Sequence, residues 1–477
     1  MVISPTGARC AASDCPGTPV HEGRCPEHLS EEQINHWLAD MAPGEYVDLS
    51  NCRVPAELFD RIAYAVCNAE GQPSFGHFGF AHGTVVGGTA YFSEADFTGP
   101  VDFTGSSFPA GLDLSQCTFH TDVSLSATTV TGTLDLSRTT FRSPVRLGIC
   151  ARAVDLSGAR FEEKSTVALR YADVDLTDAV FLQPVAVAAR PSPFPGADES
   201  GFAGVDPGVR IRSLRGVDAS LLSLAHTDLT HCRFAGSFHL DQLHLEGRWT
   251  LGTAPPGWRT RRLVVAEERA WRAWPERRAR ARAGWGEPSQ VEPPGLATLT
   301  TVYRQLRKAR EDAKDEPGAA DLYYGEMEMR RHSHDHRRAE RWLLDAYWLL
   351  SGYGLRASRA LGWLAAAMLT TVVLLMGFGL PDDTPRQEVR QVTADDGKPI
   401  TVLDKPEPEL TKPYGERFTG ERFDKALTVT LNSVVFRTSG QDLTTAGGYI
   451  EMVSRFTEPV LVGLAVLAVR GRVKRGS

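Results

Sequence analysis

The sequence predicts a mixed fold: a β-solenoid built from short repeats, then an α-helical region, then two membrane-spanning helices. Three observations support this fold class. The stretch from Val101 to Pro144 divides into four lines of eleven residues with the same apolar pattern. Ala360 to Leu380 is an apolar segment of 21 residues without a charge, and a second apolar stretch from Tyr449 to Arg470 lies near the end of the chain.

The four lines read VDFTGSSFPAG, LDLSQCTFHTD, VSLSATTVTGT and LDLSRTTFRSP. Their apolar residues fall at the first, third and eighth places, and a small residue occupies the sixth place in each line: Ser106, Cys117, Thr128 and Thr139. A spacing near five fits neither a helix nor an antiparallel strand, and it suits a chain that turns a corner every five residues. Repeats this short share a core only by stacking.

These lines resemble the pentapeptide-repeat family, together with the matching triplets Ala95-Asp96-Phe97, Ala159-Arg160-Phe161 and Ala179-Val180-Phe181. The resemblance implies a right-handed four-sided β-helix over residues 71–250. A proline- and glycine-rich loop near residues 190–208 interrupts the register. The family indicates a fold and not an activity, because unrelated functions share one fold.

Four potential metal ligands stand in residues 1–29, in a C-x4-C-x9-C-x2-H arrangement: Cys10, Cys15, Cys25 and His28. Thiolate and imidazole ligands at this spacing can close a tetrahedral zinc site. The polar residues between them have too little apolar surface to fold by burial, so the metal would supply the folding energy. We therefore expect one structural zinc ion, with His21 as a substitute ligand. A disordered tail with scattered cysteines is the alternative.

Residues 30–70 are expected to cap the first coil. Ser30 and Gln33 form a capping box for a helix from Glu31 to Met41, and proline opens a second helix from Pro55 to Cys67. Between them, Val47-Asp48-Leu49-Ser50 is the first segment of the chain that has the repeat pattern. The end of a solenoid needs such a cover because an open coil exposes unpaired backbone groups.

Residues 251–295 form a basic linker, in which Trp258 to Ala283 holds nine Lys and Arg against three acids, with three tryptophans. A solvated helix whose tryptophans pack on the end of the β-helix is the favoured interpretation. A membrane-surface contact comes next, and nucleic-acid binding is the least favoured. Residues 296–358 are predicted to be a helical juxtamembrane region. Within it His332, His334 and His336 invite a metal hypothesis, but the surrounding arginines favour a solvated basic helix.

The first predicted transmembrane helix covers residues 359–380. Ala360 to Leu380 would span roughly 31 Å as a helix, against a hydrocarbon core of about 30 Å. Arginines precede it, which places its N-terminal side in the cytoplasm. Residues 381–422 are polar and rich in proline, and we expect a flexible loop outside the cytoplasm.

The second predicted transmembrane helix covers residues 449–470 and carries three charges on one helical face, Glu451, Arg455 and Glu458, which can pair with one another. Charges in a membrane helix normally face protein or water, so we expect this face to pack against protein. The basic tail, residues 471–477, returns the C-terminus to the cytoplasm.

Residues 423–448 resemble the pore segment of potassium channels, whose two-helix module also places a short helix between two spans. The stretches Leu322 to Arg331 and Ser351 to Gly354 resemble segments of pentapeptide-repeat proteins that carry this module. The segment that aligns with the selectivity filter is Thr438, Ser439, Gly440, Gln441 and Asp442. It lacks the aromatic residue and the second glycine of TVGYG, and with them the basis for selective potassium conduction.

Composition narrows the function classes only a little. The net charge of −7 says little about partners. Met1 to Gly17 has no apolar run, so no secretory signal is expected, and the eight cysteines favour a reducing compartment. The chain has no phosphate loop, dinucleotide fingerprint or nucleophile elbow, so we expect no enzyme.

The prediction is a two-pass cell-membrane protein with both termini in the cytoplasm, whose β-helix binds or senses a cytoplasmic protein partner. The alternatives are an oligomeric ion channel of altered selectivity, then a membrane-associated enzyme. The resemblance to channels implies a homo-oligomer, with a tetramer expected.

Overall fold

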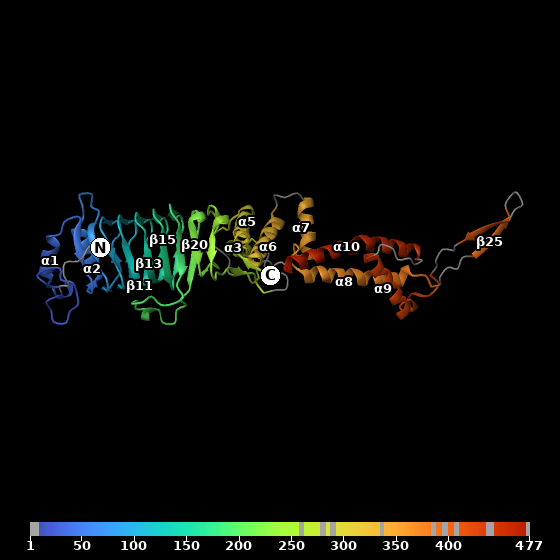
Figure 1. Cartoon of the computed structure of the whole chain (residues 1–477), viewed down its shortest axis with the longest axis horizontal. Helices are drawn as coiled ribbons and strands as arrows, with labels where there is room; N and C mark the ends of the chain where they lie inside the picture. The colour runs from blue at the N-terminus through green and yellow to red at the C-terminus, as the bar shows by residue number, and fades with distance from the viewer. Residues whose placement is uncertain are drawn as a thin grey trace. The chain divides into compact units, whose positions relative to one another are not determined.

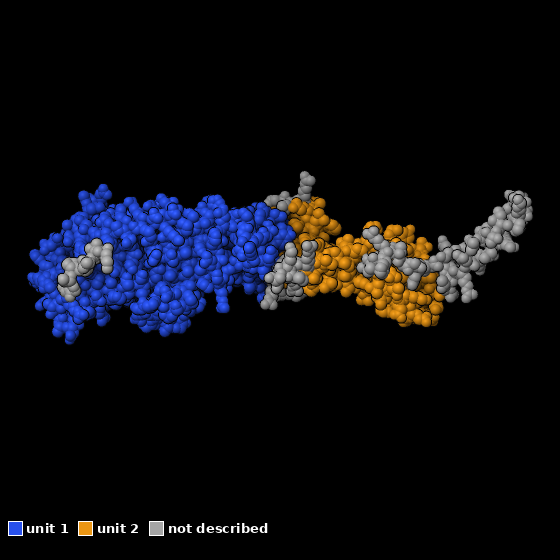
Figure 2. Space-filling model, in the orientation of Figure 1, with its two compact units in different colours: residues 1–330 blue, residues 331–477 orange. Residues whose placement is uncertain are grey.

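The structure is a computed structural model that describes residues 9–256, 262–276, 283–286, 292–333, 338–382, 388–393, 399–404, 410–435 and 443–473. The chain divides into two compact units, residues 1–330 and residues 331–477 (Figure 2). The first unit holds the repeats and the second holds both long apolar helices, as Figure 1 shows by the element labels.

The first unit is built around a parallel β-solenoid of about eight turns over residues 74–246, as the repeat pattern predicts. Its strands, with the two that precede it, are β1 Glu45–Asp48, β2 Arg53–Pro55, β3 Ser74–Gly79, β4 Thr84–Val86, β5 Ala90–Tyr91, β6 Asp96–Phe97, β7 Val101–Asp102, β8 Ser107–Phe108, β9 Gly111–Asp113, β10 Thr118–Phe119, β11 Val123–Asp135, β12 Thr140–Phe141, β13 Arg146–Asp155, β14 Arg160–Phe161, β15 Ser165–Arg170, β16 Asp173–Asp175, β17 Val180–Phe181, β18 Val185–Ala189, β19 Val209–Ser213, β20 Leu222–Ala225, β21 Thr227–Asp228 and β22 His244–Glu246.

Within the described residues these strands form four parallel ladders, one for each side of the coil. One ladder runs through β3, β6, β10, β12, β14 and β17. A second includes β7, β15, β18 and β20, a third includes β2, β4 and β8, and a fourth includes β5, β9, β16 and β19. The long strands β11 and β13 contribute to the last three ladders in succession.

The core of the solenoid is a column of stacked aromatic rings. Phe97, Phe119 and Phe141 lie in register, with ring centroids 4.8 and 5.3 Å apart and nearly parallel planes. The small residues of the sixth place are buried beside this column. Thr128 Oγ1 donates to the carbonyl oxygen of Phe103 at 2.9 Å, and Thr139 Oγ1 donates to that of Leu114 at 2.7 Å. Each such bond joins neighbouring coils, so a small polar side chain is accommodated inside an apolar core.

The aspartates of the repeat lines form the corners. Asp113, Asp135, Asp155 and Asp175 follow one another on the fourth ladder. In each one Oδ1 accepts a hydrogen bond at 2.8 Å from the backbone N–H two residues later. This is the turn that an aspartate side chain stabilises, and it explains why the pattern reads LDLS and VDLS.

The predicted loop near residues 190–208 is a folded flap and includes the short helix η2 Ser200–Phe202. Phe194 and Phe202 are buried in a small separate cluster on the outside of β11 and β13. Glu199 pairs with Arg170 at 3.1 Å and accepts a hydrogen bond from the Tyr171 hydroxyl at 2.7 Å. The two aromatic residues within the proline-rich loop are what anchor it.

The amino-terminal cap contains η1 Pro26–His28, α1 Glu31–Ala39 and α2 Ala56–Ala65. The predicted capping box of Ser30 and Gln33 is present. Both helices end two residues earlier than predicted. Helix α2 closes the end of the core because Phe59 contacts Phe80 and Phe92, with ring centroids 5.2 and 5.3 Å apart.

The last coils contain the short helices η3 Ala219–Leu221 and η4 Leu240–Gln242. The carboxy-terminal cap follows them and contains the strands β23 Gly252–Thr253 and β24 Leu263–Val264 and the helices α3 Ala266–Ala273, α5 Leu296–Asp312 and α6 Glu316–His332. Apart from the last two residues of α6, it belongs to the first unit. The stretch expected to be a basic linker is therefore partly folded. Trp271 is buried in the same core cluster as the repeats, which confirms the interpretation that tryptophan packs on the end of the β-helix. Trp258 lies outside the described residues.

Two buried glutamates explain why this basic stretch folds. Glu267 accepts hydrogen bonds from the backbone N–H groups of Phe234 and Ala235 in the last coil. Glu268 is fully buried and contacts Arg262, Arg272 and the Tyr303 hydroxyl. The arginines predicted to face solvent or lipid are thus used in part to neutralise a buried carboxylate.

The second unit contains α7 Arg338–Ser351, α8 Ala357–Leu374, the π-helix η5 Leu375–Gly379, β25 Glu388–Thr393, β26 Pro399–Asp404, η6 Tyr414–Glu416, α9 Gly420–Val435 and α10 Thr445–Val473. The expectation of an unstructured loop over residues 381–422 is wrong in part, because β25 and β26 pair as an antiparallel hairpin. The β-branched residues in EVRQVT and PITVLD favour strands, and the prolines and acids around them obscured that signal.

Candidate metal centre and membrane module

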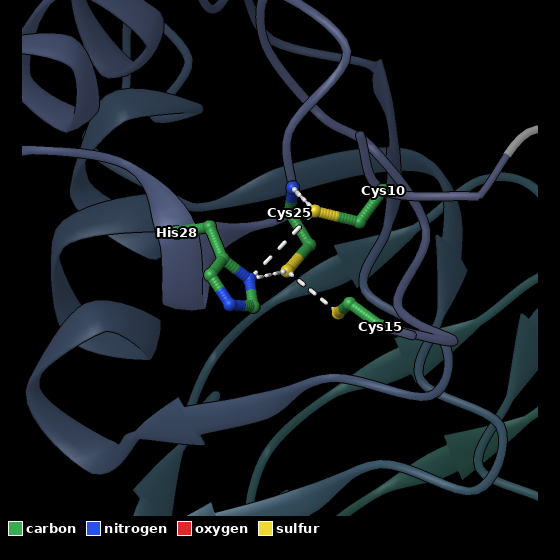
Figure 3. A group of neighbouring side chains, drawn as sticks. All are labelled: Cys10, Cys15, Cys25 and His28. Atoms are coloured by element: carbon green, nitrogen blue, oxygen red, sulfur yellow. Dashed lines mark hydrogen bonds between the residues drawn. The ribbon is translucent and has the colours of Figure 1, made fainter. Parts of the chain in front are cut away.

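The structure brings together the four residues predicted to bind zinc. The ligand atoms of Cys10, Cys15, Cys25 and His28 all lie within 4.8 Å of one another, on the turn-rich segment and on η1 (Figure 3). Cys10 and Cys25 are buried, Cys15 is half-buried and His28 is exposed. The substitute ligand His21 is not in this group; its ring lies against His36, with centroids 5.6 Å apart.

The spacing of these atoms fits a tetrahedral ion. Cys25 Sγ lies 3.6 Å from Cys15 Sγ and 3.2 Å from His28 Nδ1, and Cys10 Sγ lies 3.7 Å from His28 Nδ1. A zinc ion with bonds of about 2.3 Å to sulfur and 2.0–2.1 Å to nitrogen needs ligand atoms about 3.5 to 3.8 Å apart. Small shifts would therefore seat one ion among the four side chains.

The local fold presents the thiols inward. Cys10 N donates to Gly17 O at 3.0 Å, and Arg24 N donates to His21 O at 2.9 Å, which closes the turn before Cys25. A Cβ on Gly17 would lie 3.0 Å from Cys52 Sγ and 3.1 Å from Cys25 Cβ, so the chain passes the cluster at a distance that only glycine allows comfortably.

The electrostatics of the cluster favour a bound cation. Burial opposes ionisation of Cys10, but the backbone N–H of Cys25, 3.3 Å from its Sγ, helps to lower the pKa of Cys10 to about 7. Burial and the neighbouring Cys15 and Cys10 thiols raise the pKa of Cys25 to about 12. Three thiolates this close repel one another unless a metal ion neutralises them.

A fifth cysteine stands beside the cluster without belonging to it. Burial raises the pKa of Cys52 well above its usual range. Its Sγ donates to the carbonyl oxygens of Thr18 and Ser50 at 3.8 and 3.4 Å, so it is a neutral thiol in the core of the first coil. Thr18 N also donates to Ser50 O at 3.0 Å. The cysteine-rich segment thus covers the first repeat line directly.

The membrane module consists of two helices that could span a bilayer. The segment Ala357–Gly379 is 23 residues long and Thr445–Val469 is 25 residues long. The first is about 35 Å long as a helix, enough to cross a hydrocarbon core of about 30 Å. Both begin a few residues before the predicted starts at residues 359 and 449. They lie side by side along much of their length within the second unit (Figure 1).

Helix α9 packs against both of these helices. Ala426 and Val429 are buried with Val372, Leu375 and Met376 of the first helix in a small core. The predicted pore-like residues Thr438, Ser439, Gly440, Gln441 and Asp442 lie outside the described residues. A short helix does lie between the two spans: α9, Gly420–Val435, begins three residues before the predicted segment of residues 423–448.

The three charges of α10 agree with the prediction in part. Arg455 Nη2 donates to Glu451 Oε1 at 2.7 Å, as expected. Glu458 is fully buried and turns towards α8, where its Oε1 accepts a hydrogen bond from Thr371 Oγ1 at 2.9 Å. Glu458 therefore joins the two apolar helices, because a buried carboxyl in an apolar pair takes the nearest donor.

Sequence reasoning missed the contact between the start of α9 and the end of the first apolar helix. Arg422, at the start of α9, donates to Asp382 Oδ1 at 2.7 Å and to the carbonyl oxygens of Met376 and Leu380 at 3.0 and 2.6 Å. These carbonyls lie at the end of the first apolar helix, where intrahelical donors run out. The sequence did contain a signal for this ion pair: the acid Asp382 follows the first span, and the base Arg422 stands at the start of the next helix.

Two glycines permit a close approach at the same end. A Cβ on Gly447 would lie 2.5 Å from Gly379 O, and a Cβ on Gly379 would lie 3.1 Å from Gly447 Cα. Thr444 Oγ1 donates to Phe378 O at 2.6 Å across this contact. Small residues that let backbones touch are a recurring means of packing membrane helices.

A family model described as pentapeptide repeats, nine copies, matches residues 81–129. No curated protein and no solved structure matches the chain. The match lies within the solenoid, at the coils where the aromatic column is regular. The chain thus combines pentapeptide repeats in a parallel β-solenoid with two helices that could span a membrane and a Cys3His cluster that could bind a metal.

Proposed function

We propose that the protein is a membrane-anchored scaffold whose β-solenoid presents a rigid cytoplasmic surface to a protein partner. The observation that carries this proposal is the paired arrangement of α8 and α10, two helices of spanning length joined by the buried Thr371–Glu458 hydrogen bond. A second support is the solenoid itself, since parallel ladders closed at both ends form a rigid platform.

The Cys3His cluster would hold zinc in a structural role. All four coordination positions are filled by protein side chains, which leaves none open for a catalytic water. The ion would join a segment that has little apolar surface of its own to the first repeat line. We propose that both termini are cytoplasmic, because arginines precede the first span and follow the second.

A second candidate function is an oligomeric ion channel of altered selectivity, and helix α9 favours it. It begins on the outer side of the module and packs between α8 and α10, where a pore helix would lie. The segment that aligns with the filter lacks the second glycine, so a tetramer of this module would not reproduce the potassium site. A membrane-associated enzyme is the third candidate, and it lacks a recognisable catalytic motif.

One set of measurements tests the anchor. Full-length protein should stay with the membrane after alkaline extraction. A variant that lacks residues 357–473 should be released, and a matched deletion of the hairpin, residues 388–404, should stay. Release of the full-length protein would contradict the anchor.

Ion flux separates the scaffold from the channel. Full-length protein reconstituted in liposomes should give no flux above that of empty liposomes if it is a scaffold. Flux that stops in Gly440→Ala but persists in a control such as Gly463→Ala would overturn the scaffold in favour of the channel.

A further inference from the structure

Helix α7 carries an apolar face that no described part of the chain covers. Trp342, Leu343 and Leu349 are 71, 62 and 45% exposed. Trp342 and Leu349 are spaced at i and i+7, with Ala346 at i+4 between them, which places Trp342, Ala346 and Leu349 along one side of the helix, the apolar face. Leu343 lies beside this face and not on it. Soluble proteins rarely leave several large apolar side chains together in water, so this face calls for an apolar environment.

Another side of α7 makes contacts within the second unit. The Trp348 ring lies between two guanidinium groups, with Arg331 4.4 Å and Arg359 5.3 Å from its centroid. Arg359 Nη1 also donates to Trp348 O at 2.8 Å. These contacts set the rotation of α7 about its axis, and the apolar face points outward as a result.

The chain turns sharply between α7 and α8. Gly352, Tyr353 and Gly354 all have positive φ, at 56, 59 and 73°, and α7 runs across the direction of α8 instead of continuing it (Figure 1). A helix that crosses a membrane span at its end lies roughly in the plane of the bilayer. Under the proposed topology, α7 lies at the cytoplasmic end of α8.

The apolar face of α7 is continuous with the apolar surface of α8. Trp363 Nε1 donates to Leu349 O at 3.1 Å, which ties the end of α7 to the second turn of α8. Trp363 and Leu361 are themselves 42 and 49% exposed. If lipid surrounds α8, the lipid-exposed surface would therefore continue without a break to Leu349 of α7.

We infer that α7 is an interfacial helix, seated at the boundary between headgroups and acyl chains on the cytoplasmic side of the bilayer. Tryptophan suits this boundary because it combines an apolar body with a polar N–H. Arg338 and Arg341 lie one turn apart along one edge of the apolar face, where lipid phosphates would be within reach. A second copy of the chain or another protein would be a different occupant of the same face.

Site-specific photo-crosslinking tests this inference, which rests on the proposed membrane anchor. The full-length protein is reconstituted in phosphatidylcholine–phosphatidylglycerol liposomes with a benzophenone amino acid at one position per variant. The test positions are Trp342 and Leu349 on the apolar face, and the matched control is Glu340, which lies on the side of α7 away from both. Leu369 on α8 and Val460 on α10, 62 and 60% exposed, report on the spans themselves.

We expect lipid adducts at Trp342 and Leu349 at a level comparable with Leu369 or Val460, and several-fold above that at Glu340. Adducts at the span positions but none at Trp342 and Leu349 would overturn the interfacial helix and leave the anchor intact. Crosslinks from Trp342 to a second copy of the chain would also overturn it. Lipid adducts at neither span position would remove the anchor, and the inference with it.

Discussion

Substitution of Cys25 by serine should release the metal and open the end of the solenoid. Cys25 Sγ contacts both Cys15 and His28, and its backbone N–H contacts Cys10. A serine hydroxyl is a poor zinc ligand and keeps its proton at neutral pH. Three ligands would remain, so we expect bound zinc to fall from about one ion per chain to near zero in the presence of a competing chelator.

The size of the effect follows from what the cluster covers. Cys52 is 1% exposed beneath it, so its thiol reacts only when the segment opens. A ligand present at a thousand times its Kd stabilises the form that binds it by about 4.1 kcal/mol, which is about a thousandfold in the opening equilibrium. In Cys25→Ser, modification of Cys52 should therefore be faster by up to about three orders of magnitude at saturating zinc.

The assay combines elemental analysis with peptide-level mass spectrometry of thiol modification in the full-length protein. A chelator should accelerate Cys52 modification in the natural protein and change little in Cys25→Ser. The matched control is Cys67→Ser, since Cys67 lies outside the ligand group; zinc content and Cys52 reactivity should stay unchanged. Equal zinc in Cys25→Ser, or Cys52 modification that ignores the chelator, would refute the structural metal centre.

Three further outcomes are expected. A cysteine at Thr393 should react with an impermeant thiol reagent in intact cells and one at His244 should not, and the reverse pattern would invert the topology. Phe119→Ala should cost about 3–5 kcal/mol, because its ring stacks on neighbours 4.8 and 5.3 Å away, and hydrogen exchange should accelerate in those coils; unchanged exchange would contradict the aromatic column. Burial works against the charge of Glu268, but Arg262 lowers its pKa to about 2, so about 3 kcal/mol of cap stability is present above pH 4.5 and lost as pH falls towards 2. Glu268→Gln should lack this acid-dependent increase in exchange, and an identical pH profile would contradict the ion pair.

The features predicted correctly are those in which a local pattern has one physical solution. Large apolar residues five places apart, each preceded by a small one, fit a coil with a corner every five residues, and the register of Phe97, Phe119 and Phe141 follows. The Cys3His cluster is a second case, because the four side chains come together as predicted. Their spacing along the chain was sufficient to identify them because the turns that join them are short.

The features that were missed depend on contacts between distant parts of the chain. Glu267 and Glu268 lie in a stretch that is basic overall, and only the position of the last coil shows why two acids are buried there. Arg422 and Asp382 are 40 residues apart in sequence. A charge count over a whole segment indicates only a polar loop or a basic linker. It does not show that Glu267 and Arg422 each form hydrogen bonds with particular backbone groups at a coil end or a helix end.

The two ends of the solenoid are closed by different chemistry, and this bears on where the proposed partner would bind. At one end Phe59 and the cysteine-rich segment cover the first coil. At the other end Glu267 takes the backbone N–H groups of Phe234 and Ala235, which would otherwise be free to pair with an added strand. These contacts work against strand addition at either end, a common mode of recognition for open sheets. We therefore expect a partner of the proposed scaffold to bind the side faces of the coils, where side chains of successive repeats point outward at the regular spacing of the ladders.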